Sequence, residues 1–134
     1  MKNFVYALVL GLLLISCTPE GDTYRLVVLP VAKVEMETAF RKDSVTKIAV
    51  KYLRPSNCHF YEDFYYVREG FTRVVAIYNS ELNKDNCQPI ENDTITVPLS
   101  FKPTELGTYT FKFWKGTNAD GIEEFDEYQA EVNH

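Results

Sequence analysis

An all-β fold, an antiparallel β-sandwich of about seven strands, is the architecture that the sequence predicts. Apolar and polar residues alternate with a period of two in several windows, and no window shows a helical period with caps. Aromatic residues make up 14% of the chain, with nine Tyr and nine Phe, and such residues favour β-structure. Turn residues separate the windows at the spacing typical of sandwiches. The 134 residues fit one domain of this kind.

Four strands are expected in the first half of the chain. Pro30 interrupts the first of them, and the last is apolar on both faces, which indicates a central strand. The tripeptide 68–70, which ends in a glycine, predicts a hairpin between the last two strands. The expected ranges are 24–37, 46–53, 59–67 and 71–78.

Three further strands are expected in the second half, at 94–101, 108–114 and 128–132. Pro98 cannot donate a backbone hydrogen bond, so its strand is predicted to be an edge or to be bulged there. Residues 118–121 (Asn-Ala-Asp-Gly) carry turn residues and predict another hairpin.

One segment indicates a more specific kind of sandwich. Residues 105–111 (Glu-Leu-Gly-Thr-Tyr-Thr-Phe) resemble the tyrosine corner of immunoglobulin-like domains, an acidic-x-Gly-x-Tyr-x-Cys run. The resemblance implies an immunoglobulin-like β-sandwich over residues 23–134, with the Tyr109 hydroxyl bonded back to the backbone. Phe111 stands where antibody domains have a core cysteine, and no inter-sheet disulfide can be matched. The resemblance covers this corner and the strand count, and it implies nothing about function.

The N-terminus has the layout of a secretory signal peptide. Lys2 precedes an apolar run over residues 4–15 that only Gly11 interrupts. Twelve helical residues span about 18 Å, which is short of the ~30 Å hydrocarbon core of a bilayer. We therefore expect an export signal and not a membrane-spanning helix.

The end of that run carries a second resemblance. Leu14-Ile15-Ser16-Cys17 resembles the lipobox of bacterial (Gram-negative) lipoproteins: a branched residue, a small residue before the cut, then an obligatory cysteine. The resemblance implies that residues 1–16 are a signal peptide and that Cys17 carries diacylglycerol and a further acyl chain such as palmitate. The alternative is an ordinary signal peptide with a coincidental cysteine.

The residues after Cys17 point to the destination of the protein. Thr18 follows the cysteine, whereas the family's inner-membrane retention signal is an Asp at this position. The resemblance therefore implies outer-membrane anchoring, with the periplasmic or surface face left open. Residues 17–22 would form the lipidated cysteine and a short tether.

The two remaining cysteines, Cys58 and Cys87, are expected to form a disulfide. An exported compartment favours pairing, and both residues lie at the open end of the hairpin expected over 59–78. Two free buried thiols are the alternative. A metal site that also uses His59 is disfavoured, because adjacent side chains on a strand point to opposite faces. No metal or other cofactor is expected.

Outward aromatic side chains are the best candidates for contacting a ligand or partner. Tyr61 and Tyr65 belong to an aromatic-rich hairpin, and Trp114 falls opposite the expected core face of its strand, beside Lys112. Such residues stack on sugar rings or anchor protein interfaces. The alternative is that they cover a second packed layer.

Two tripeptides are candidates for O-glycosylation. Asp43-Ser44-Val45 and Asp93-Thr94-Ile95 resemble the Asp-Ser/Thr-aliphatic acceptor that some Gram-negative bacteria use on exported proteins. Ser44 and Thr94 would carry the sugar. The alternative is that these residues only mark the junction of a loop with a strand.

The net charge and the motifs of the sequence reduce the number of possible functions. The net charge of −5 argues against nucleic acid as a partner, and no catalytic motif is present. We therefore expect a non-enzymatic, outer-membrane-anchored lipoprotein that acts as an interaction or accessory module of an envelope complex. The alternative is a glycan-binding lipoprotein that uses its outward aromatics.

Overall fold

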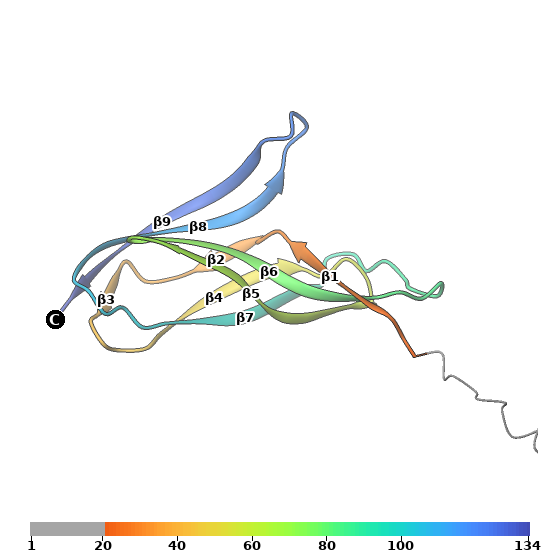
Figure 1. Ribbon diagram of the computed structural model, residues 1–134, viewed down its shortest axis with the longest axis horizontal. Coiled ribbons are helices and arrows are strands. Elements are labelled where there is room, and N and C mark those ends of the chain that lie inside the picture. Colours follow the sequence, from red (N-terminus) through yellow and green to blue (C-terminus); the bar gives the residue numbers. More distant parts are fainter. Residues whose placement is uncertain (1–20) are drawn as a thin grey trace, which may run out of the picture.

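Two β-sheets packed face to face make up the protein in the computed structural model, which describes residues 21–134 (Figure 1). The expectation of an all-β sandwich is confirmed. The predicted signal peptide, Cys17 and most of the tether lie outside the described residues. The larger sheet contains β1 (Tyr24–Leu29), β3 (Ala39–Arg41), β5 (His59–Glu69), β6 (Thr72–Leu82), β8 (Gly107–Thr117) and β9 (Glu123–Asn133). The smaller sheet contains β2 (Lys33–Glu35), β4 (Thr46–Leu53) and β7 (Thr94–Phe101).

The described part of the chain has nine strands, where about seven were expected. The expected strand over 24–37 is divided into β1 and β2, because Pro30 cannot continue a ladder and the chain there crosses between the sheets. The three-residue strand β3 is too short to show a period of two. The other six expected strands are confirmed, and most of them extend a few residues further.

The core forms where the alternating apolar residues of the two sheets meet. Ile48 and Val50 of β4 and Phe111 and Phe113 of β8 are all 0% exposed. Phe111 packs edge-on against Phe101 of β7, with the ring centroids 5.0 Å apart. The alternation read from the sequence thus selects the side chains that face the opposite sheet.

Strand β6 is the centre of the larger sheet. One of its edges pairs with β5 along the whole hairpin. Its other edge is shared, because residues 77–82 pair with β1 and residues 72–75 pair with β8. The strands β1 and β8 therefore approach each other head-on along one edge of β6. The prediction of a central strand is confirmed.

Two strand pairs are parallel, β6 with β8 and β3 with β9, so the expectation of a purely antiparallel sandwich is wrong in those places. The chain runs along β6, returns along β7 in the other sheet, and enters β8 in its original direction. Within residues 21–134, strand β7 pairs only with β4, so Pro98 lies on an edge strand, the first of the two predicted alternatives.

Both predicted hairpins are present, and each has a local cause. Gly70 adopts a φ of +60°, a conformation that costs glycine little, between β5 and β6. In the other turn, the Asn118 side-chain oxygen accepts hydrogen bonds from the backbone N–H groups of Asp120 and Ile122, both at 3.0 Å. The backbone bond implied for the Tyr109 hydroxyl is not found within residues 21–134. The Tyr109 ring instead packs edge-on against the Phe71 ring, with the ring centroids 4.9 Å apart.

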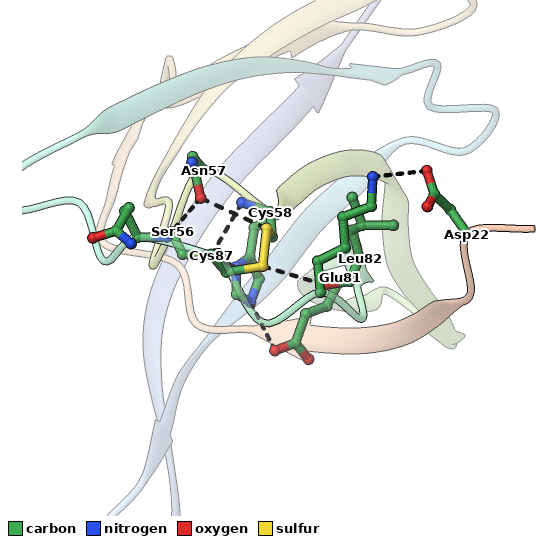
Figure 2. Close-up of a disulfide and its surroundings, with 10 residues drawn as sticks. Asp22, Ser56, Asn57, Cys58, Glu81, Leu82 and Cys87 are labelled. Carbon is green, nitrogen blue, oxygen red and sulfur yellow. Dashed lines mark hydrogen bonds and ion pairs between the residues drawn. A yellow bond between two sulfur atoms is a disulfide. The ribbon is translucent and has the colours of Figure 1, made fainter.

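A disulfide closes the end of the sandwich at which β1 begins. Cys58 and Cys87 are bonded, with their Cα atoms 5.6 Å apart, which confirms the predicted pair. Figure 2 shows the bridge joining the start of β5 to the loop that follows β6. Asn57 reinforces the link, because its side-chain oxygen accepts a hydrogen bond from the Gln88 backbone N–H at 2.8 Å.

Removing the bridge with the double variant Cys58→Ala/Cys87→Ala is expected to lower the free energy of unfolding by about 3–4 kcal/mol, because the 29-residue loop gains freedom in the unfolded chain. Urea denaturation measures the change. Intact mass before and after reduction is the control. A two-thiol mass for protein isolated from an oxidising compartment would contradict the pairing.

Candidate functional site

The larger sheet turns one face away from the core, and we call it the outer face. It consists of alternate residues of β1, β5, β6, β8 and β9 that stand opposite one another in the strand register. Large apolar side chains are exposed along it: Leu26 is 60% exposed and Tyr24 59%. The other apolar members are Val28, Phe60, Tyr65, Val67, Val74, Ala76, Tyr78, Leu82, Trp114 and Phe125.

A hollow of about 310 Å³ lies near the middle of the outer face, and we call it the Trp114 hollow. It exists because β1 and β8 meet head-on along β6 and then diverge. Ala76, 1% exposed, lies at this point, and larger side chains from the other strands surround it. The lining residues are Val28, Tyr65, Val74, Ala76, Trp114, Glu123 and Phe125.

Trp114 occupies the point where β1 ends against β8. Its backbone oxygen accepts a hydrogen bond from the Val31 N–H at 2.8 Å, which fixes the residue beside the gap. Its indole Nε1 is buried and has no hydrogen-bond partner within the part of the chain that the structure describes. A buried donor without an acceptor costs roughly 1–3 kcal/mol. An oxygen supplied by a bound molecule would satisfy this N–H group.

Polar groups complete the rim of the Trp114 hollow. Glu123 contributes the single carboxylate of its lining. Tyr65 is 37% exposed and packs edge-on against Tyr78, with the ring centroids 5.8 Å apart. An apolar floor with a few polar groups at the rim is the usual make-up of a small-ligand or anchor-residue pocket.

Lys112 lies on the outer face beside the Trp114 hollow. Its ammonium group is 3.4 Å from the Glu127 carboxylate and 5.2 Å from the centre of the Phe125 ring. The lysine therefore holds Phe125, which lines the hollow, and is not itself part of the lining.

Tyr61 lies on the opposite face of the sheet. The strand register shifts between Tyr61 and Asp63, and this bulge turns Tyr61 toward Tyr52 of the other sheet, 6.5 Å between ring centroids. Burial raises the pKa of the Tyr61 hydroxyl, and the nearby Asp63 adds to the rise. Of the four predicted contact residues, the structure thus brings Trp114 and Tyr65 together and separates Tyr61 from them.

The two candidate glycosylation residues are both exposed. Ser44 follows Asp43, which has a positive φ of 59°, in the loop before β4. Thr94 is the first residue of β7. The carboxylate of the preceding residue, Asp93, forms an ion pair with Arg54, with 2.5 Å between Arg54 Nε and Asp93 Oδ2. Both hydroxyls are therefore at junctions of a loop with a strand, on parts of the surface away from the Trp114 hollow.

One polar cluster was not found from the sequence. His59 Nδ1 lies 2.7 Å from the Ser56 hydroxyl, and its Nε2 lies 3.9 Å from the Glu81 carboxylate. The Ser56 oxygen also accepts the Cys58 N–H, and Glu81 is bound by Arg25. These bonds fix the turn that carries the disulfide. Over residues 21–134, no group of three or more His, Cys, Asp or Glu side chains is arranged to hold a metal ion.

No protein-family model, curated protein or solved structure matches this chain. No helix within residues 21–134 is long and apolar enough to cross a bilayer.

Proposed function

We propose that the protein is a non-enzymatic lipoprotein, anchored in the outer membrane through Cys17, that acts as an interaction or accessory module of an envelope complex. The observation that carries the proposal is the outer face, where apolar side chains from β1 and β5 are exposed beside the Trp114 hollow. Contiguous exposed apolar surface marks interaction sites. Aromatic anchors such as Trp and Tyr supply much of the affinity at such surfaces.

The tether fixes which end of the sandwich would face the membrane. Residues 17–22 reach about 20 Å when extended. The chain then joins the fold beside the disulfide loop, where Thr23 accepts the Asn83 N–H at 2.9 Å and Asp22 pairs with Lys84 at 3.1 Å. With Cys17 lipidated, this end lies near the lipid and the outer face stands beside it, open to a neighbour in the envelope.

We also propose that the sandwich is a divergent member of the immunoglobulin-like group. Three features support it: β4 pairs with β7, the short strand β3 lies parallel to the last strand, and Gly107 and Tyr109 are the first and third residues of β8. The parallel pair β6–β8 sets the chain apart from antibody domains, whose sheets pair the corresponding strands antiparallel.

Glycan binding is the second candidate function, and the unpartnered Trp114 N–H favours it. Sugar hydroxyls are good acceptors, and sugar rings stack on the aromatic side chains that line the Trp114 hollow, Tyr65 and Phe125 among them. Glu123 would accept hydrogen bonds from further hydroxyls. The volume of about 310 Å³ is at the small end of the range for ligand pockets.

Replacing the proposed anchor residue, Cys17→Ser, is expected to move the protein from the membrane fraction to the soluble fraction, because the acyl chains supply the attachment. Fractionation of producing cells, followed by immunoblotting, measures this. The Cys58→Ala/Cys87→Ala variant serves as the control that keeps the anchor. Retention of the Cys17→Ser protein in the membrane would overturn the lipidation proposal.

Introducing a charged side chain on the outer face is expected to weaken binding of the proposed envelope partner. In cells treated with a crosslinker, Leu26→Glu should reduce recovery of the co-purified envelope protein by about tenfold or more, the effect of losing a central apolar contact. Leu53→Glu is the matched control, because Leu53 is 51% exposed on the smaller sheet. Equal recovery with both variants would show that the outer face is not the interface.

Binding to immobilised polysaccharides tests the second candidate. Trp114→Ala is expected to weaken glycan binding at least about tenfold, with the fold checked by circular dichroism. Tyr61→Ala is the control, since Tyr61 faces away from the Trp114 hollow. If the wild-type protein binds no glycan on a broad array, the glycan-binding candidate is rejected and the protein-interaction proposal stands.

A further inference from the structure

A second hollow, of about 450 Å³, opens between the edge strands β5 and β7 of the two sheets. We call it the cationic hollow. Arg68, Arg73 and Lys102 line it, and Asp63 is the single carboxylate of the lining. Three positive charges around one hollow are notable in a protein whose net charge is −5. The ion pairs found among residues 21–134 include none of these three cations.

Arg73 is the central residue of this hollow, and it is only 8% exposed. Its Nη1 donates to the backbone oxygens of Gly70 and Thr72, at 2.7 and 2.9 Å. The guanidinium carbon lies 5.0 Å from the centre of the Tyr109 ring and 5.8 Å from that of Phe101. Its Nε has no hydrogen-bond partner among the described residues.

Burying a cation without a counter-charge is costly. Two carbonyl oxygens and two aromatic faces compensate part of the charge of Arg73, and no carboxylate of residues 21–134 forms an ion pair with it. The strand register makes the arrangement costlier, because Arg68 of β5 stands directly opposite Arg73 of β6. Like charges at directly opposed positions destabilise a sheet. A bound anion would remove both penalties.

The walls of the cationic hollow are aromatic. Phe64, Tyr66 and Phe101 line it together with the three cations. Burial raises the pKa of the Tyr66 hydroxyl above its usual value, and the nearby Arg73 and Arg68 oppose the rise. Tyr66 therefore stays neutral near pH 7 and offers an O–H donor beside the guanidinium groups.

We propose that the cationic hollow binds an anionic group, a carboxylate, phosphate or sulfate, carried on a ring-sized ligand such as an acidic sugar. The planar guanidinium fork matches oxyanions with two parallel hydrogen bonds, and Lys102 adds a point charge. A volume of about 450 Å³ exceeds the needs of a bare oxyanion, and the aromatic walls fit a ring. The proposal is independent of the membrane anchor and of the outer face.

Calorimetric titration of the purified full-length protein, at constant ionic strength, tests the proposal with four probes: glucuronate, inorganic phosphate, sulfate and glucose. We expect saturable binding of glucuronate and no binding of glucose. Arg68→Gln and Lys102→Gln should each weaken the affinity for glucuronate about tenfold, the loss of one charge-assisted hydrogen bond. Lys47→Gln, which removes an exposed lysine of β4, should change the affinity less than about twofold.

Melting temperature separates a binding role from a structural one. Without ligand, Arg68→Gln should melt no lower than the wild type, because it removes the opposed like charge. With glucuronate, the wild type and Lys47→Gln should gain stability equally, and Arg68→Gln should gain less at the same ligand concentration because its affinity is weaker. Binding of phosphate or sulfate alone would also support an anion site and would identify a free oxyanion as its ligand. Equal binding of glucose, equal stabilisation of all variants, or no saturable binding of any anion would overturn the proposal.

Discussion

Strand β6 has three partners and only two edges, and the rest of the structure follows from how it accommodates them. The β5 hairpin occupies one edge completely, so β1 and β8 divide the other between residues 77–82 and 72–75. Where they meet, neither strand continues to pair with β6, and the sheet is left with a gap above Ala76. Because the side chains of β6 that face the core are fully buried there, Val75 and Ile77 both at 0% exposure, the fold keeps its core while the outer face acquires the Trp114 hollow.

The β5–β6 hairpin contributes to both hollows through its period of two. On the outer face, Tyr65 stands opposite Ala76 and lines the Trp114 hollow. On the other face, Arg68 stands opposite Arg73 and lines the cationic hollow. The two proposed sites therefore lie on opposite faces of one hairpin. The disulfide holds the far end of the same hairpin, so the protein places its most constrained element between the two candidate sites.

Buried polar atoms without hydrogen-bond partners occur at both the Trp114 hollow and the cationic hollow. Within residues 21–134, three buried side-chain nitrogens have no hydrogen-bond partner: Trp114 Nε1, Arg73 Nε and Asn79 Nδ2. Native proteins leave few buried polar groups unpaired, so each such group needs a reason. Trp114 lines the hollow on the outer face and Arg73 lines the cationic hollow. Asn79 lies between the sheets, where its oxygen accepts the Tyr52 hydroxyl at 3.4 Å.

The sequence by itself determined the all-β class, six of the nine strands and the pairing of Cys58 with Cys87, and it restricted Pro98 to an edge or a bulge, because alternation, proline chemistry and cysteine number are local or compositional properties. Only the tertiary structure decided which strands are neighbours, and hence the parallel pairs, the outward or inward position of Tyr61 and the meeting of Arg68 with Arg73. A single bulge or crossover changes these relationships without changing the period of two. The hollows depend on contacts between strands distant in sequence, and no local pattern records those contacts.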